Sequence, residues 1–398
     1  MAYDNGAAAT MNNPATLGLM PEGNRLDVAL GFLGPDITTS MPGASAKSSA
    51  DLFIMPAAGW VHKKGAIAYG VGVFAQGGMG TEYAADSFLA MGSGEKVRSE
   101  LGVGRFIVPF VYSATPDLNI GASLDYVWAS LDLQMALPGS QFVNLVTSCT
   151  GPACAGLGGF AAAPWTRLDF SSGGAMNGSA RGTGFAGKLG ATYKIGPTFT
   201  IGAAYQSKTS LGDLETKDTG AVISASGFGT VGTGKIKVID FQWPETYAVG
   251  ASWNASKQFM VVADIKQINW SDVMKDFKMT YEGPLAGAPG NAVSFALPQN
   301  WKNQTVYELG AAYLFTPEFT GRIGMNIANN PIPDQYLNYL FPAIEKNHYT
   351  IGAGYAFSQA SSIDFSFAYA PEVKVTAGNG MTTAHSQTNE QIMFSLRF

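Results

Sequence analysis

Two cysteines, Cys149 and Cys154, are the residues of this chain whose type and spacing most directly suggest chemistry. They stand in the run Cys-Thr-Gly-Pro-Ala-Cys, in which Gly151 and Pro152 can turn the chain so that the two thiols meet. We expect a disulfide, and therefore an oxidising compartment. A metal-binding or redox pair is the alternative, but the sequence places no His and no third Cys nearby.

The sequence holds no spacing typical of an enzyme or of a metal site. The three His residues, His62, His348 and His385, lie far apart and fit no zinc motif. Two Gly-x-Gly-x-x-Gly matches, at 182–187 and 227–232, are expected by chance among 49 Gly, and neither opens a helix after a strand. We therefore expect no enzyme, no cofactor and no metal. A Ser–His pair that meets across strands stays open as a minor alternative.

Composition indicates a membrane β-barrel. Of the 398 residues, 13% are charged, about half the usual share, and Gly is about doubled. No stretch reaches the ~20 apolar residues of a membrane helix, and only helices and closed barrels satisfy all backbone groups in lipid. The net charge is −5, and the absence of a basic patch argues against nucleic acid as a partner.

Alternating segments from about residue 24 to the C-terminus predict an all-β, 14-stranded antiparallel transmembrane barrel. The segments lie near 24–38, 50–63, 66–82, 97–114, 117–136, 181–195, 198–216, 236–253, 258–278, 302–315, 318–328, 346–357, 361–376 and 386–398. Short turns alternate with longer connections along the whole chain, as periplasmic turns alternate with extracellular loops. We expect the main extracellular loops at about 137–180, 217–235, 279–301 and 329–345.

Side-chain parity assigns an apolar face to lipid and a polar face to the lumen. The inward face carries charges of both signs, with Lys188, Lys266, Glu308, Arg322 and Arg397 as candidate lumen residues. Each is expected more often to join a structural ion pair than to bind a ligand. A fatty acid would need one of the cations near its carboxylate, whereas an alkane or an aromatic would not.

Two features interrupt the barrel pattern. Gly77, Gly78 and Gly80 end the third segment, where Gly favours a bulge or kink; such a break could open the wall toward lipid, or it could be a flexible run into a loop. The long loops are unusually apolar, which is typical of a binding surface or of a lid. Their candidate ligand-capture residues are Phe142, Val146, Leu157, Phe160, Trp165, Leu340 and Phe341.

The two ends of the chain have separate expectations. Residues 1–23 do not alternate and hold Asn13-Pro14-Ala15, which suggests either a frayed terminus or a segment folded inside the barrel. No signal peptide is visible, so we expect that one has been removed. The last segment, 391–398, alternates and ends on Phe398, which suits the closing strand of an outer-membrane barrel. We expect it to pair with the segment near Arg25.

The whole chain resembles the FadL family (OmpP1/FadL/TodX type) of outer-membrane long-chain fatty-acid and hydrocarbon transporters. The resemblance rests on Asn13-Pro14-Ala15, on the third-segment ending at 78–83, on 244–250 with Asn269-Trp-Ser-Asp272, and on 307–310 through Asn329-Asn-Pro-Ile-Pro333. It implies a 14-stranded barrel plugged by an N-terminal hatch, here residues 1–23 and truncated relative to the family, followed by the barrel, 24–398.

The resemblance also implies a function. Outer loops would capture a hydrophobic small molecule, such as a fatty acid, alkane or aromatic, and release it sideways through the third-strand kink by passive diffusion. A general porin for polar solutes and a structural or adhesive barrel are the alternatives. Expected partners are this ligand, outer-membrane lipid, and the barrel-assembly machinery through Phe398, with the protein a monomer in the outer membrane of a Gram-negative bacterium.

Overall fold

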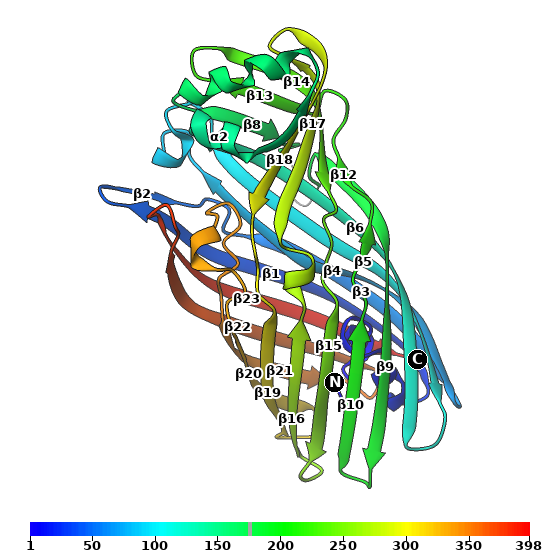
Figure 1. Ribbon diagram of the computed structural model, residues 1–398. Helices are drawn as coiled ribbons and strands as arrows, with labels where there is room; N and C mark the ends of the chain where they lie inside the picture. The colour runs from blue at the N-terminus through cyan, green and yellow to red at the C-terminus, as the bar shows by residue number, and fades with distance from the viewer. Residues whose placement is uncertain (174–176) are drawn as a thin grey trace.

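The computed structural model describes residues 1–173 and 177–398. Long antiparallel strands form a tilted barrel wall (Figure 1). Its strands are β1 (Gly23–Met41), β3 (Phe53–Lys64), β4 (Ile67–Tyr83), β5 (Val97–Ser113), β6 (Leu118–Leu137), β9 (Ala180–Ile195), β10 (Phe199–Gln206), β15 (Thr246–Asn254), β16 (Phe259–Ile268), β19 (Gln304–Leu314), β20 (Phe319–Ala328), β21 (Asn347–Ala356), β22 (Ser361–Thr376) and β23 (Thr382–Arg397). The predicted closure is correct, because β1 pairs with β23 from Arg25 opposite Arg397 to Ser40 opposite Thr382.

Further strands and short helices complete the described part of the chain. The strands are β2 (Ala44–Lys47), β7 (Val146–Thr150), β8 (Thr166–Phe170), β11 (Ser210–Leu211), β12 (Leu214–Glu215), β13 (Ala221–Ala225), β14 (Gly229–Ile239), β17 (Asp276–Leu285) and β18 (Ala288–Pro298). The helices are η1 (Gly6–Ala8), α1 (Ala9–Asn12), η2 (Pro14–Leu19), η3 (Phe88–Ala90), α2 (Gly139–Leu145), η4 (Pro152–Ala162), η5 (Trp270–Asp272) and η6 (Asp334–Tyr336).

The expected count of fourteen strands is wrong. In the described part of the chain the closed sheet has 18 strands, because β8, β13, β14 and β12 join the wall between the outer ends of β6 and β9. Lower down, β6 pairs directly with β9, from Leu118 opposite Tyr193 upward. The prediction was wrong because the residues of β8 and β13, and most of β14, were assigned to loops.

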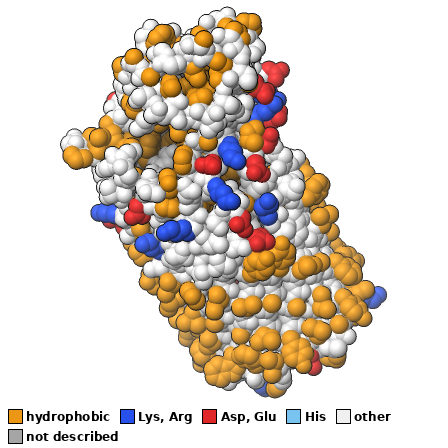
Figure 2. All heavy atoms as spheres, viewed as in Figure 1, with side chains coloured by type: hydrophobic (Ala, Val, Ile, Leu, Met, Phe, Trp, Pro, Cys, Tyr) orange, Lys and Arg blue, Asp and Glu red, His pale blue; other side chains and the backbone are white. Residues whose placement is uncertain are grey.

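The membrane-facing surface follows the predicted parity. An apolar band crosses the lower barrel on the face shown in Figure 2, with a zone of mixed charge above it. Exposed aromatic residues of this band include Tyr69, Phe106, Phe185, Tyr247, Trp253, Tyr307 and Tyr349. Aromatic side chains of this kind are typical of the membrane interface. Among the described residues no helix has the length and apolarity needed to cross a membrane.

The N-terminal segment folds inside the lower barrel (Figure 1). It contacts the inner wall at glycines, where the missing side chains leave room. A Cβ at Gly121 would lie 2.7 Å from the Ala15 nitrogen, and one at Gly59 would lie 2.5 Å from the Ala7 Cβ. A small apolar core that includes Leu17 joins this segment to β3, β4 and β5. The largest buried apolar cluster, however, lies in the outer half of the molecule.

Candidate functional site

An apolar cavity of ≈ 130 Å³ lies inside the outer half of the barrel. Its wall combines inward side chains of β5 and β6 with the segment around Trp243, the residues that flank the β17–β18 hairpin, and the loop between β20 and β21. None of the residues that line it is charged, and its polar side chains are Gln299 and Asn338. The cavity can therefore hold an apolar group but offers no ionic partner.

Six aromatic residues line the cavity: Phe241, Trp243, Trp270, Phe277, Trp301 and Phe341. The indole of Trp270 packs edge-on against Trp243, at a centroid distance of 5.3 Å, and against Trp301, at 5.0 Å. Phe277 packs against Phe341 at 6.0 Å. Edge-to-face packing at these distances is favourable between rings, so a further ring can join the cluster. The buried indole nitrogen of Trp270 has no hydrogen-bond partner in the described part of the chain.

The loop between β20 and β21 covers the cavity and is fixed to the wall. The carbonyl oxygen of Leu340 accepts hydrogen bonds from the hydroxyls of Thr81, at 3.3 Å, and Ser99. At its end, His385 of β23 contacts Glu345 at 2.7 Å and the carbonyl of Pro342 at 2.8 Å. Burial alone lowers the pKa of His385, but the hydrogen bond and charge of Glu345 outweigh it and raise that pKa above its ordinary value.

The barrel wall is interrupted beside this cavity. Within the described residues the ladder between β3 and β4 ends at the pair Ala58 and Val73. Contact between the two sides resumes where the Ser49 amide donates to the Glu82 carbonyl at 2.8 Å. We call the intervening gap in pairing, between residues 53–57 of β3 and 74–81 of β4, the β3–β4 window. The ring of Phe53 lies across it, within 3.0 Å of a Cβ built at Gly80.

The predicted glycine kink lies on this window. Between Ala75 and Gly77 the register of β4 against β5 shifts, which marks a bulge. Gly77 and Gly78 line the apolar cavity, so the kink joins the cavity to the window.

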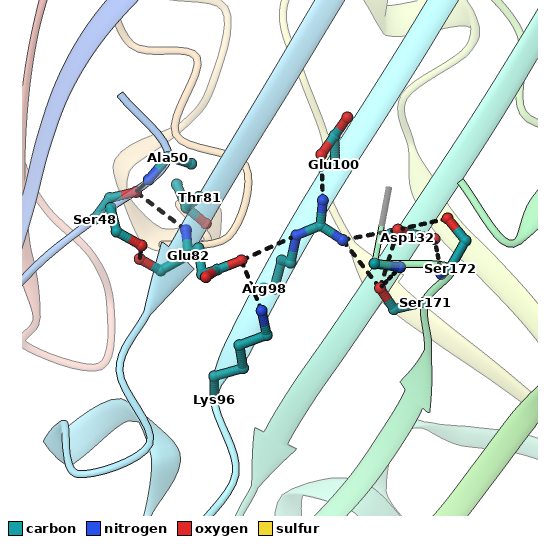
Figure 3. Close-up of polar contacts among 12 residues, drawn as sticks. Ser48, Ala50, Thr81, Glu82, Lys96, Arg98, Glu100, Asp132, Ser171 and Ser172 are labelled. Carbon is teal, nitrogen blue, oxygen red and sulfur yellow. Dashed lines mark hydrogen bonds and ion pairs between the residues drawn. The ribbon is translucent and has the colours of Figure 1, made fainter. Parts of the chain in front are cut away.

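A polar cluster stiffens the wall near the window (Figure 3). Arg98 of β5 binds Glu82 of β4 at 3.2 Å, Asp132 of β6 at 2.7 Å and the hydroxyl of Ser171 at 3.0 Å. Asp132 is fully buried and also accepts from the Ser172 amide at 2.9 Å. Because Glu82 is the residue that closes the window at its end, these contacts fix one corner of the window to β5 and β6.

The predicted lumen charges lie away from the apolar cavity. Lys188 binds Asp125, which also binds Arg105, and Lys266 pairs with Glu308 at 3.2 Å. Glu308, Arg322 and Arg397 line a second cavity, of ≈ 820 Å³, in the lower lumen, whose lining mixes charged and apolar side chains. Asp364 also lines that cavity, and its carboxylate binds Arg322 at 2.7 Å.

The predicted capture residues divide into two groups. Phe341 lines the cavity, and Leu340 is buried beside it. Residues 137–165 instead form α2, β7 and η4 in the outer part of the molecule. Here Phe142, Leu157 and Phe160 are buried, Phe142 packs on Phe295 at 5.0 Å, and Val146 and Trp165 are half-buried. The same region contains the disulfide between Cys149 and Cys154, as expected.

Trp243, Trp270 and Trp301 line the cavity but were not among the predicted site residues. Trp270 stood inside a recognised motif, and its aromatic type at an irregular position between strands was the available signal. The Asn13 motif lies in the N-terminal segment inside the barrel. The side chain of Asn13 accepts from the Ala15 amide at 3.1 Å and donates to the Ala191 carbonyl at 3.2 Å, so it joins this segment to β9. The described residues contain no cluster of three His, Cys, Asp or Glu that could hold a metal.

Comparison with known proteins gives consistent matches over the whole chain. The family model described as outer membrane protein transport protein (OMPP1/FadL/TodX) matches residues 1–395. The Pseudomonas putida toluene transporter TodX is 33% identical, with 100% of this chain and 95% of that chain covered and a TM-score of 0.87. The Ralstonia pickettii toluene transporter TbuX is 32% identical, with 100% and 95% covered and a TM-score of 0.81.

A third solved structure, described as the CymD monoaromatic hydrocarbon channel, is 27% identical over 100% of this chain and 94% of that chain, with a TM-score of 0.79. A search of curated proteins returned no match.

Proposed function

Because the chain belongs to the OMPP1/FadL/TodX family of outer-membrane transport proteins, we propose that it admits small, uncharged aromatic hydrocarbons, which leave through the β3–β4 window into the membrane. Membership in a family of transport channels also sets aside the enzyme alternative. The observation that carries the proposal is the uncharged, Trp-rich cavity of ≈ 130 Å³.

The size and chemistry of the cavity favour one aromatic ring over a long acyl chain. A dry apolar cavity of about 150 Å³ in another protein holds benzene. A fatty acid would require a longer groove and a cation to compensate its buried carboxylate, because an unpaired buried charge is costly. The unpartnered N–H of Trp270 is compatible with the π face of a ring as a weak acceptor. The toluene transporters among the relatives point the same way.

The polarity of the lower lumen supports sideways release. Below the apolar cavity a hydrocarbon would meet the N-terminal segment and a cavity with five carboxylates, those of Asp4, Asp264, Glu308, Glu318 and Asp364. Toluene corresponds to a Phe side chain, whose burial is favourable by about 1.5–3 kcal/mol relative to water. Passing from the cavity through the window into lipid keeps that gain, whereas passing through the lumen loses it.

The three cavity tryptophans provide the test. We expect toluene to change the intrinsic fluorescence of the purified protein saturably, with a dissociation constant of roughly millimolar magnitude, from about 3–5 kcal/mol of burial and ring stacking. Palmitate at equal free concentration should cause no saturable change. If palmitate instead binds saturably near these tryptophans, and toluene displaces it, the result would favour a fatty-acid channel.

A further inference from the structure

The side chain that determines the shape of the window is Gln76. The register of β4 on β5 runs from Ala75 opposite Gly104 to Gly77 opposite Val103, which leaves Gln76 as the extra residue of the bulge. A bulge of this kind bends its strand and increases the local twist. Gln76 therefore stands at the point where β4, having left β3 after Val73, turns past the cavity.

Gln76 is bound by a buried arginine on the neighbouring strand. Arg105 donates from Nε to the Gln76 Oε1 and from Nη1 to Asp125 on β6, at 2.8 Å. Asp125 also accepts from Lys188 on β9 and from the Ser123 hydroxyl, at 2.7 Å. The contacts thus run across four neighbouring wall strands, β4, β5, β6 and β9, and end on the bulge residue that lies between the paired residues Ala75 and Gly77.

The charges of this group indicate why Arg105 is present. Asp125 and Lys188 would balance each other without it, and both Arg105 and Asp125 are fully buried. With the guanidinium of Arg105, the three side chains carry a net positive charge. Burying that charge is unfavourable unless the contacts of Arg105 compensate its cost. Beyond Asp125, the side-chain contact that Arg105 makes among the described residues is with Gln76. Its Nη2 has no partner in the same part of the chain.

We propose that Arg105 is a positioning residue that fixes the β4 bulge through Gln76 and so keeps β4 apart from β3 at the window. This inference rests on the proposed function. Arg105 and Gln76 do not line the apolar cavity, but Gly77 and Gly78, which follow Gln76 directly, do. The contact therefore controls the exit of the ligand rather than its binding. Without it, the bulge is free to relax and β4 can extend its pairing toward residues 53–57 of β3.

The test separates exit from binding. In Gln76→Leu the amide acceptor is lost while the side chain keeps its size. Arg105→Met removes the guanidinium and leaves the balanced Asp125 and Lys188 pair, so the buried group remains neutral. For each variant we expect toluene uptake by Gram-negative cells to fall about tenfold toward the empty-vector level, the loss expected for a charge-assisted hydrogen bond. Toluene affinity from tryptophan fluorescence should stay within about twofold of the unchanged protein.

Two further variants control for structure. Gln76→Glu keeps an acceptor for Arg105 and should restore uptake, whereas Gln258→Leu, in an exposed turn, should leave it unchanged. The double variant Gln76→Leu with Arg105→Met should be no worse than either single one, because the two residues share one interaction. Circular dichroism and melting temperature establish that each variant is folded.

Wild-type uptake in Gln76→Leu and in Arg105→Met would overturn the inference while leaving the proposed function intact. An equal loss of affinity and uptake in both would also overturn it, since the pair would then act on the cavity. If the unchanged protein neither binds nor takes up toluene, the proposed function itself fails.

Discussion

At the scale of single residues, Gly77 leaves no room for a side chain at the edge of the apolar cavity. A Cβ built there would lie 2.7 Å from Cη2 of Trp243, well inside normal contact. Gly78, the next residue, also lines the cavity, but the nearest atom to its built Cβ is the Leu101 carbonyl oxygen at 3.5 Å. A methyl group therefore fits at Gly78 but collides with Trp243 at Gly77.

We expect Gly77→Ala to weaken toluene binding about tenfold, because Trp243 must move and the small cavity loses its fit to a ring. Fluorescence titration of the purified protein measures the effect. Gly78→Ala is the matched control and should bind toluene like the unchanged protein. Equal affinities in the two alanine variants would show that Trp243 does not form the binding surface.

His385 gives the loop between β20 and β21 a dependence on pH. Its pKa in the folded protein is raised above the ordinary value, since the hydrogen bond and charge of Glu345 exceed the opposing effect of burial. The stabilisation is therefore fully present below the ordinary His pKa of about 6.5, and it is lost as pH rises through the raised pKa. After correction for intrinsic rates, amide exchange at 339–345 should be faster at about pH 9 than at about pH 5.

His385→Gln provides the control for this pH dependence. Gln can still donate to the Pro342 carbonyl or to Glu345 but does not titrate, so corrected exchange of the loop should be the same at both pH values. His62, which bonds Asn24 at 3.0 Å at the opposite end of the barrel, gives a second control. The His62→Gln variant should keep the pH dependence. If the pH dependence is lost in this variant, it does not arise from the contact between His385 and Glu345.

At the scale of elements, alternation predicted the wall well where one face meets lipid. β9, β21 and β23 lie within two residues of the predicted limits or extend a few residues beyond them, because lipid on one side and the lumen on the other impose period two. Above the membrane that constraint disappears. Burial still alternates along β13, β14 and β18. These strands are, however, short and rich in Gly, Ala, Ser and Thr, so most of their residues were predicted to be loop.

The site could be predicted only in part for the same reason. A glycine cluster is visible in the sequence, and so is an apolar loop, but the cavity is formed where Trp243, Trp270 and Trp301 from three separate segments meet. Contacts between segments far apart in sequence have no local pattern. The inward charges were visible, yet their pairing into Lys188–Asp125, Lys266–Glu308 and Arg322–Asp364 depends on strand register.

The loop between β20 and β21 should contribute directly to affinity. Phe341→Ala removes a ring that lines the cavity and packs on Phe277, so we expect toluene to bind about tenfold more weakly, with little change in the melting temperature. Phe228→Ala is the matched control, because that ring is 58% exposed in the turn between β13 and β14, away from the cavity lining. Unchanged affinity in Phe341→Ala would mean that the loop is only a cover.

At the scale of the whole molecule, the barrel separates an apolar upper compartment from a polar lower one. The upper cavity is lined by uncharged residues and touches the window at Gly77 and Gly78. The lower cavity carries paired charges and borders the N-terminal segment through Tyr3 and Asp4. A hydrocarbon is favoured in the first, in the window and in lipid, but not in the second. The hydrocarbon can therefore move from the upper cavity through the window into lipid, driven only by its own concentration gradient.

Bridging the window tests this account most directly. The two Cys of the chain are joined in a disulfide, so Phe53→Cys with Gly80→Cys introduces one thiol on each edge of the window, available to a short thiol-specific cross-linker. Toluene uptake is measured in intact Gram-negative cells before and after bridging, with the two single-cysteine variants treated alike. We predict that bridging reduces uptake to the empty-vector level while fluorescence still reports toluene binding. Undiminished uptake through a bridged window would contradict lateral release and place the path through the polar lumen.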